Sequence, residues 1–319
     1  MAVNDSATLF DTAEDPVEPP EDHGADTGLA AVIAWFRKKD DLEALFAQSI
    51  RQSLDEVLDG QRTGRFDVEE LDKTEKSYLG TKVEIVVRAA FELPKGERMD
   101  YAIDGHDIDA KWSIRREWNI PREAMGHLCL LMSANDRKAT FDVGLIRIQP
   151  ELLNEGQNQD KKKTLNADGR SRIVWLFRNA RLPRNLLLSL PPDVREKILA
   201  SSSGQKRATE LMRHVRGVLI DRNTAITVAR QLDGMRRCRN TRTPLSQEGI
   251  AVLGHMADGP KIAKALQLPV PSSGTLISVR LIQVPDDTTD RPTALISGRR
   301  YAVIDSDEPT DQLPLIKNS

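Results

Sequence analysis

The chain has 319 residues, a formal net charge of -2 and 39% hydrophobic residues, so it is long enough for two domains with sizeable cores. It has no apolar run near the ~18 residues of a membrane span and no signal-peptide pattern, so we expect no membrane association. Two cysteines, Cys129 and Cys238, are too few for a disulfide framework or a zinc site, which favours a reducing cytoplasm.

The first 28 residues differ from the rest in charge. They contain eight acidic residues and no Lys or Arg, which leaves +6 on residues 29–319. An acidic, aromatic-poor segment cannot bury enough apolar surface to fold, so we expect a disordered tail over 1–28. Such a tail either shields a basic surface or acts as an inert solubilising segment, and we favour the second.

Three helices are expected before the first strand. Leu29–Phe36 and Leu42–Leu58 have helical patterns, and Asp59-Gly60 ends the second of them. The third, Thr74–Phe91, has Thr74 as N-cap, and Gly80 favours a start nearer Lys82. Its apolar stripe consists of Leu79, Val83, Val86, Val87 and Ala90.

Glu84 lies at the flank of that stripe. A helix packed beside the next element would hold Glu84 at the edge of a shared cleft. The alternative is an ordinary exposed glutamate, which periodicity alone favours.

The segment Met99–Trp112 predicts a β-hairpin with opposed acidic residues. Asp104-Gly105 is a strong two-residue turn, and the register that it sets places Asp100 opposite Asp109. One face is then apolar, and the other carries Asp100, Asp107, Asp109 and Lys111. Carboxylates across a ladder repel, so they either remain in water, as on a solvated acidic face, or bind a cation.

The spacing of Asp100, Asp109 and Lys111 is that of a PD-(D/E)xK nuclease site. Carboxylates hold Mg2+ ions, which neutralise the charge of a phosphodiester transition state and lower the pKa of the attacking water. A lysine beside them orients that water and stabilises the phosphate. Short motifs of this kind also match by chance, so these residues alone do not decide the function.

The segments after the hairpin predict further strands and a loop. His127–Met132 and Phe141–Ile148 are apolar and extend the hairpin into a sheet. The polar segment Glu155–Ser171 predicts a loop. Its lysines, Lys161 to Lys163, either contact phosphate or belong to a solvated turn.

The clearest basic cluster lies at Gln205–Arg242, where ten Lys or Arg face three acids. A helix over Ala208–Ile220, a turn at Asp221–Asn223 and a second helix over Ala225–Leu232, capped by Thr224, suit a helix-turn-helix on DNA. A solvated basic face is the alternative. The arginines that we select for DNA binding are Arg213, Arg216, Arg230, Arg236, Arg237 and Arg239.

Two later segments, Leu276–Val284 and Thr293–Ile304, predict strands that form a wing. The residues from Glu308-Pro309 onward predict a tail over 308–319.

Five segments resemble the NaeI-type restriction endonucleases, within a similarity from about Leu54 to Ala302. They are DGQRTGRFDVEELDKTEKSYLGTKVEI (Asp59–Ile85), MDYAIDGHDIDAKWS, MGHLCLL (Met125–Leu131), NLLLSLPPDVR (Asn185–Arg195) and LQLPVP (Leu266–Pro271). This resemblance implies a type IIE enzyme. Such an enzyme is a homodimer with an N-terminal nuclease domain and a C-terminal DNA-binding domain that binds a second site and activates cleavage. The second domain of the family resembles the helix-turn-helix module of catabolite activator protein and type I topoisomerases.

The resemblance assigns roles to four residues. Glu84 matches the family's helix carboxylate, Asp100 its first Asp, and Asp109 and Lys111 its Asp-x-Lys pair, with Ala110 where the family can have Cys. The implied catalytic residues are therefore Glu84, Asp100, Asp109 and Lys111, with the three carboxylates binding Mg2+. The chain departs from the family in a more basic segment over Trp112–Glu123, at Arg236–Thr243 and in extra N-terminal residues, which puts the target sequence in doubt rather than the chemistry.

These observations predict an α/β protein with an N-terminal restriction-endonuclease-like mixed-sheet domain and a C-terminal winged helix-turn-helix-like domain. The resemblance implies a linker over 176–184, so the expected boundaries are 29–175 for the nuclease domain and 185–307 for the DNA-binding domain. The resemblance further implies Mg2+-dependent cleavage of double-stranded DNA at a GC-rich palindrome similar to GCCGGC, by a homodimer that binds two sites. The alternatives are a repair-type nicking endonuclease and a non-catalytic DNA-binding regulator.

Overall fold

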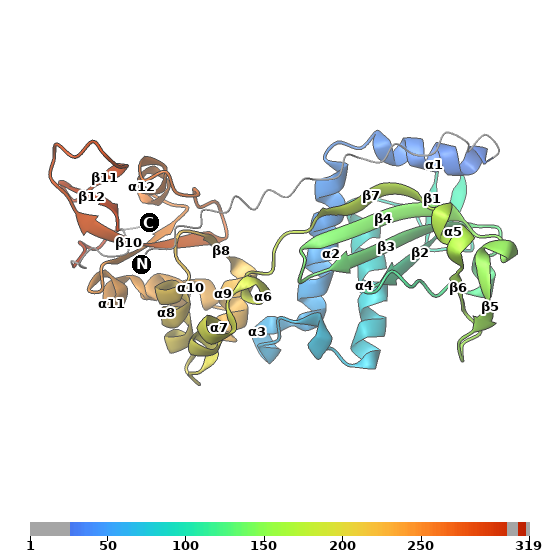
Figure 1. The fold of residues 1–319 in the computed structure, drawn as a ribbon, viewed down its shortest axis with the longest axis horizontal. Coiled ribbons are helices and arrows are strands. Elements are labelled where there is room, and N and C mark those ends of the chain that lie inside the picture. Colours follow the sequence, from blue (N-terminus) through green and yellow to red (C-terminus); the bar gives the residue numbers. More distant parts are fainter. Residues whose placement is uncertain (1–25, 305–311, 317–319) are drawn as a thin grey trace, which may run out of the picture.

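The structure, a computed structural model, describes residues 26–304 and 312–316, which form two parts (Figure 1). The tail predicted over 1–28 lies outside the described residues except for residues 26–28. These three are ordered, because Asp26 caps helix α1 (Thr27–Arg37) by accepting from the Leu29 N–H at 2.9 Å and pairs with Arg147 at 2.6 Å. No helix among the described residues is long and apolar enough to cross a membrane.

The first part is built on a five-stranded mixed sheet with the strand order β1-β2-β3-β4-β7. Strands β2 and β3 are parallel, and the other neighbours are antiparallel. Its elements after α1 are α2 (Leu42–Leu58), α3 (Gly60–Thr63), η1 (Val68–Glu70), α4 (Lys73–Ala90), β1 (Tyr101–Ile103), β2 (His106–Ser113), η2 (Arg122–Ala124), β3 (Leu128–Asn135), β4 (Thr140–Arg147), η3 (Pro150–Leu152), β5 (Leu153–Gln157), β6 (Lys163–Leu165), α5 (Ala167–Ser171) and β7 (Val174–Arg181).

Most predicted elements of this part are confirmed. The hairpin register is as expected, with Tyr101 opposite Ile108 and Ile103 opposite His106. Helix α4 begins earlier than expected: Asp72, not Thr74, is its N-cap and forms a capping box with Glu75. The helix continues through Gly80, because this strong N-terminus and the packing of its apolar face offset the propensity cost of one glycine.

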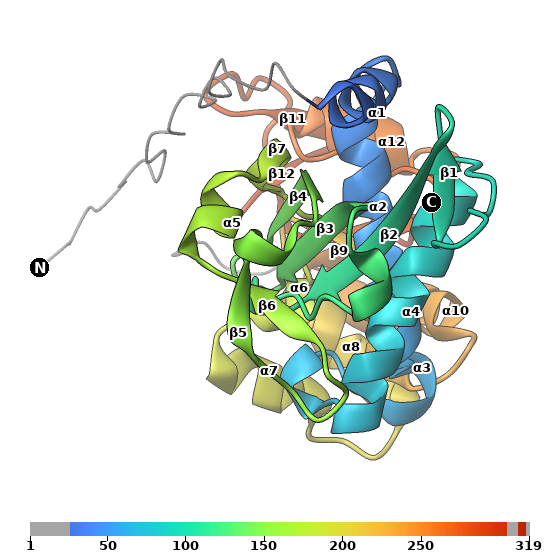
Figure 2. The same ribbon diagram turned by 90° about the vertical axis from the view of Figure 1, so that its right-hand side faces the viewer.

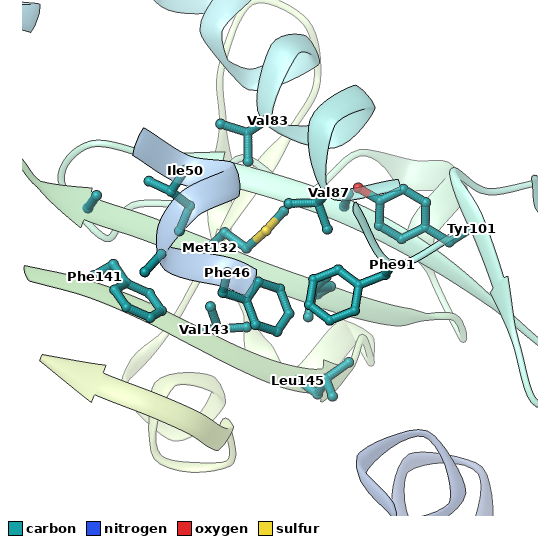
Figure 3. Packing of buried hydrophobic residues seen from close by; sticks show 14 of the residues in the cluster. Phe46, Ile50, Val83, Val87, Phe91, Tyr101, Met132, Phe141, Val143 and Leu145 are labelled. Atoms are coloured by element: carbon teal, nitrogen blue, oxygen red, sulfur yellow. The ribbon is translucent and has the colours of Figure 1, made fainter. Parts of the chain in front are cut away.

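Helices α1, α2 and α4 cover one face of the sheet. Phe46 and Ile50 of α2 and Val83 and Val87 of α4 pack over Met132 and neighbouring strand residues (Figure 3). Ala90, expected on the apolar stripe of α4, is exposed. Side chains of β3 alternate between the two faces. Leu128, Leu130 and Met132 join this core, while Cys129 and Leu131 join a smaller core on the opposite face.

The opposite face carries Trp118, Ile120, α5 and a two-stranded sheet formed by β5 and β6 (Figure 2). We call residues 153–165 the arm. The arm and α5 replace most of the loop predicted over Glu155–Ser171, because buried Leu153 and Leu165 fix the base of the pair and Asn166 caps α5.

Most of the segment predicted as a linker, 176–184, is also a strand. Val174–Arg181 forms β7 and pairs with β4, so the two parts are joined by only a few residues before α6. The linker position is implied by the family resemblance, and the polar second half of β7, Arg178–Arg181, is compatible with an edge strand because only one side of such a strand needs to be apolar.

The second part combines small helices with a sheet of order β11-β12-β10-β8, in which β9 also pairs with β10. Its elements are α6 (Leu186–Ser189), α7 (Pro192–Leu199), α8 (Gly204–His214), β8 (Leu219–Asp221), α9 (Arg222–Ala229), α10 (Gly234–Asn240), α11 (Arg242–Ser246), β9 (Ile250–Gly254), α12 (Gly259–Ala265), β10 (Thr275–Gln283), β11 (Thr293–Ile296) and β12 (Arg299–Val303).

Several predictions for this part need correction. The helix expected over Ala208–Ile220 ends at His214, and Leu219–Asp221 becomes strand β8 because it pairs with Thr275–Ile277. Asp221, not Thr224, caps α9. The strand expected over Thr293–Ile304 is a hairpin that turns at Ser297-Gly298, both with positive φ.

The predicted tail over 308–319 is described only at 312–316. This segment packs against the second part, since Leu313 is buried and its N–H donates to the Ser246 carbonyl at 2.8 Å. The remaining tail residues lie outside the described ranges.

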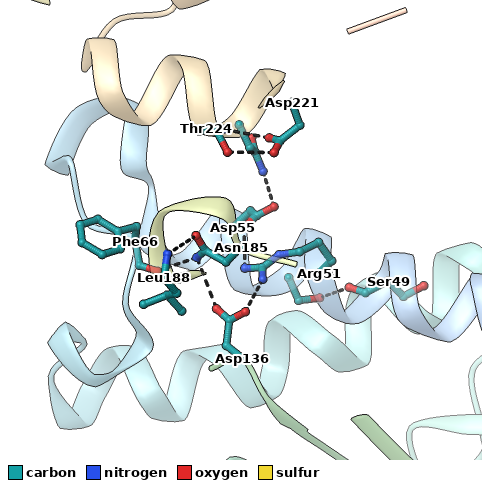
Figure 4. Close-up of polar contacts among 11 residues, drawn as sticks. Ser49, Arg51, Asp55, Phe66, Asp136, Asn185, Leu188, Asp221 and Thr224 are labelled. Atoms are coloured by element: carbon teal, nitrogen blue, oxygen red, sulfur yellow. Dashed lines mark hydrogen bonds and ion pairs between the residues drawn. The ribbon is translucent and has the colours of Figure 1, made fainter. Parts of the chain in front are cut away.

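The two parts meet through polar contacts (Figure 4). Asn223 of α9 donates to the Asp55 carboxylate of α2, and Arg51 pairs with both Asp55 and Asp136 at 2.6 Å. Asn185 donates to the Phe66 carbonyl at 2.7 Å. A groove of about 1250 Å³ between α2, α3 and the second part lies beside these contacts.

Candidate active site

Asp109 and Lys111 lie on a stretch of β2 that β1 leaves uncovered. Strand β1 pairs only with His106–Ile108, so the following residues of β2 have β3 on one edge and no described strand on the other. Asp100 directly precedes β1, and its Oδ2 accepts from the Ala110 N–H at 2.7 Å. The predicted proximity of Asp100 to the Asp-x-Lys segment is therefore present.

The Lys111 ammonium holds the Asp109 carboxylate. Nζ donates to Asp109 Oδ1 at 2.6 Å and to the Ala110 carbonyl at 3.0 Å. Asp109 is only 6% exposed, and burial raises its pKa; the Lys111 charge opposes this increase, and nearby Asp100 adds to it. A buried carboxylate with one cationic partner and one anionic neighbour is suited to binding a further cation.

Glu84 approaches the same site from α4. Burial raises its pKa, and the charges of Asp100 and Asp109 raise it further, while Lys111 and Arg88 lower it. The Tyr101 hydroxyl donates to the Glu84 carbonyl at 2.9 Å and so ties α4 to β1. All four predicted residues are thus within electrostatic reach of one another.

The donor set is suited to Mg2+, because oxygen ligands are what this ion prefers and a cation would relieve the repulsion among the three acids. Among the described residues, however, no three His, Cys, Asp or Glu side chains are arranged to hold a metal ion. The three-carboxylate ligand set therefore remains a prediction.

Cys129 is a site neighbour that the sequence analysis missed. It is the residue of β3 paired with Asp109, and its buried thiol lies 3.6 Å from Asp109 Oδ2. Burial raises the pKa of this thiol most, and the negative charge of Asp109 raises it further. The thiol therefore stays protonated and donates a hydrogen bond to Asp109. No sequence signal indicated this contact, because parallel pairing of β2 with β3 joins residues from separate segments.

Asp107 shares the acidic face in the sequence pattern but has a structural role. Its two carboxylate oxygens accept from the Glu97 and Arg98 N–H groups, both at 2.9 Å. These bonds hold the loop before β1, so Asp107 positions the hairpin instead of contributing to the acidic cluster.

Of the six arginines predicted to bind DNA, three lie outside α10 and three lie on it. Arg213 is tied to Glu248 by two bonds of 2.7 Å and also pairs with Glu210, and Arg230 packs against Gly64 of the first part. Arg216 is exposed. The other three lie on α10, where Arg236 and Arg237 pair with Asp233 and Arg239 is exposed.

Arg207, counted in the basic cluster, is buried. Its guanidinium donates to the carbonyls of Ser201, Val228 and Ala229 at 2.6, 2.6 and 2.9 Å. It therefore satisfies the carbonyl end of α9 and is unavailable to DNA.

Comparison with known proteins shows the family of this chain and a similar enzyme within it. The profile of the restriction endonuclease NaeI family matches residues 30–312. The type II restriction enzyme NaeI of Lentzea aerocolonigenes is 40% identical over 278 residues, which is 84% of this chain and 87% of the relative.

Proposed function

Because the chain belongs to the NaeI restriction endonuclease family and is thus a type II site-specific deoxyribonuclease, we propose that it cuts both DNA strands at a GC-rich palindrome similar to GCCGGC. The proposal includes dependence on Mg2+, action as a homodimer and activation by a second DNA site. The observation that carries it is the placement of Asp100, Asp109 and Lys111 at the open edge of β2, with Glu84 beside them.

These residues are suited to phosphodiester hydrolysis. Lys111, held by Asp109, presents an ammonium group that can orient an attacking water and donate to a phosphate oxygen as negative charge develops. Asp100 and Asp109, together with Glu84, would hold Mg2+, which when bound neutralises phosphate charge and lowers the pKa of water. One such site per chain requires two chains for a double-strand cut, which supports a homodimer on a two-fold DNA site.

The order of elements in the second part supports a winged helix-turn-helix. Helix α8 is followed by β8, α9, α10, α11, β9, α12 and β10, and β10 pairs with both β8 and β9. Helices α9 and α10 are joined by four residues, Arg230–Asp233. We therefore assign the helix-turn-helix to α9 and α10, not to α8 and α9, with α10 as the recognition helix and Arg239 available for DNA.

Mapping the ends of a fully digested DNA of known sequence tests the proposal. Ends that share a GC-rich six-base-pair palindrome are expected, because a two-fold dimer reads a two-fold site. Ends without a shared palindrome would overturn the target, and an A/T-rich site would overturn only its composition. Nicked circles that never become linear would favour a repair-type nicking enzyme.

A further inference from the structure

We propose that the arm, residues 153–165, inserts into the major groove of the substrate duplex beside the cleaved bond and contributes to base recognition. This inference rests on the proposed cleavage of DNA and adds a recognition element to the nuclease part. In Figure 1, β5 and β6 lie at the end of the molecule away from the second part, so this contact is separate from the helix-turn-helix.

The base of the arm is firmly anchored. Leu152, Leu153 and Leu165 are buried in the core on the second face of the sheet. Ile120, in the loop that follows β2, exchanges two backbone hydrogen bonds with Lys163 at 2.7 and 3.0 Å. An isolated two-stranded hairpin is only marginally stable in water, so this anchorage is what keeps the arm projecting in one direction.

The arm stands on the sheet face from which Asp109 and Lys111 project, whereas Glu84 comes from α4 on the opposite face. The core into which the base of the arm packs includes Cys129 and Leu131, which pair with Asp109 and Lys111 in the parallel ladder. Paired residues of adjacent strands share a face, and the Cys129 thiol contacts Asp109 directly. A duplex placed against Lys111 would therefore meet the arm on the same face of the sheet.

The outer half of the arm packs against none of the described cores. Residues 154–161 are all exposed, and none of the side chains in 154–162 is apolar. The Asn158 carboxamide holds the turn by accepting from the Lys162 N–H at 2.9 Å. The side chains of Gln157, Gln159, Lys161 and Lys162 form no hydrogen bond or ion pair with the described residues.

This chemistry is suited to DNA better than to another protein surface. A two-stranded ribbon fits the major groove, where amides pair with adenine and lysines with guanine or phosphate. The core of a dimer interface is apolar and depleted in lysine, so a second copy of this chain is a poor occupant. The two free glutamines and two free lysines are therefore assigned to a duplex groove.

The first test compares an arm variant with a charge-matched control. The arm variant combines Gln157→Ala, Gln159→Ala, Lys161→Ala and Lys162→Ala. The control combines Arg37→Ala and Lys38→Ala, two exposed residues at the C-terminal end of α1, which covers the opposite sheet face. Both remove two positive charges. Binding is measured without divalent cations, using a duplex that the wild type is shown to cut and a scrambled duplex.

The arm variant should lose about 10- to 100-fold in affinity for the cut sequence and much less for the scrambled one, because base contacts discriminate between sequences and phosphate contacts do not. The control should change both affinities by similar, small factors. An arm variant that behaves like the control, or that weakens both duplexes equally, would overturn base recognition by the arm.

A second test is independent of any loss of function. Native Cys129 and Cys238 are both buried, so Gln159→Cys supplies a single accessible thiol for a maleimide, and Lys38→Cys supplies the control. An intact duplex that contains the cleaved sequence should slow maleimide labelling at position 159 at least about tenfold and leave the labelling rate at position 38 unchanged. Equal labelling with and without DNA would exclude the arm from the groove.

The outcomes distinguish a failure of the arm proposal from a failure of the proposed function. A wild type that cuts no duplex at a defined site refutes the function, whereas site-specific cutting with an unprotected arm refutes only the arm. Sedimentation tests whether the arm instead contacts a second copy of this chain. If the wild type is a dimer and the arm variant is a monomer, the arm belongs to the dimer interface and not to a DNA groove.

Discussion

At the scale of single residues, the structure gives Lys111 a fixed partner. The bond of 2.6 Å to Asp109 positions the ammonium, and the low exposure of Asp109 reduces the screening of that pair by water. Asp109 in turn has Lys111, Asp100 and Cys129 around it. Removing either Lys111 or Asp100 would therefore change the electrostatic environment of the Asp109 carboxyl.

Lys111→Ala should reduce cleavage by at least about 100- to 1000-fold while binding of specific DNA stays close to wild type. The physical reason is that the ammonium acts mainly on charge that develops in the transition state. Plasmid cleavage and gel-shift binding measured on the same preparation check this. Substantial cleavage by the variant at saturating Mg2+ would contradict the assignment, and Lys38→Ala is the control for loss of an exposed lysine.

At the scale of elements, two glycines that look alike in sequence have opposite roles. Gly80 lies in the middle of α4, and a Cβ there would be 3.7 Å from Trp112 Cβ, which is ordinary contact. Gly234 opens α10 where it crosses α9, and a Cβ there would be 2.6 Å from the Ala225 carbonyl oxygen. Close approach of two helices therefore explains Gly234 but not Gly80.

Gly80→Ala should stabilise the protein by about 0.5–1 kcal/mol, because alanine loses less backbone entropy in a helix. Gly234→Ala should destabilise the second part by about 1–3 kcal/mol, because α9 and α10 must separate. Denaturant unfolding of the two variants gives the comparison. A destabilised Gly80→Ala would contradict the room for a Cβ beside Gly80, and a neutral Gly234→Ala would contradict the close contact of α10 with α9.

At the scale of the whole molecule, the contact between the two parts includes a carboxyl group with an altered pKa. Burial raises the pKa of Asp55 to about 6, and Asp221 adds to this, against the opposing effects of Arg51 and the hydrogen bond from Asn223. Asp136 also faces Arg51 and competes for its charge. The ionised form of Asp55 is therefore less favourable in the folded protein than in the unfolded chain.

This shift has a defined sign for stability. The free-energy cost of ionising Asp55 in the folded protein is absent below its unfolded pKa of 3.8. This cost grows as the pH rises towards 6 and is constant above that. Relative to Asp55→Asn, the wild type should thus lose up to about 3 kcal/mol of unfolding free energy between pH 4 and pH 7, at about 1.4 kcal/mol for each pKa unit. Unfolding curves of both proteins across this range provide the measurement, and a difference independent of pH would contradict it.

Activation by a second site is the prediction for the two parts acting together. A plasmid with one site should be cut slowly, and a short duplex bearing the site should speed cleavage by about 5- to 150-fold until it competes as substrate. Charge reversal at Arg236 and Arg237 on α10 should remove the stimulation and leave slow cleavage, because the nuclease site is untouched. A one-site plasmid cut as fast as a two-site plasmid, with no response to added duplex, would contradict this.

Local patterns in the sequence were enough for the hairpin and for α2, α4, β3 and β4. The turn Asp104-Gly105 sets the register of β1 on β2, and helical spacing sets the buried face of α4, because both effects act over a few neighbouring residues. The grouping of Asp100, Asp109 and Lys111 followed from that register, and the placement of Glu84 needed the resemblance to a family. These parts of the site are readable without coordinates.

Tertiary pairing decided what local patterns could not. Strand β8 lies where the sequence predicts the end of a helix and β7 lies where a linker is expected, because each is a strand only through a partner distant in sequence. The contact of Cys129 with Asp109, the internal ion pairs of Arg213 and the burial of Arg207 have the same origin. The sequence by itself therefore determined the local elements and the residue types of the site, and long-range packing alone decided which strands pair and which charged side chains remain free for DNA.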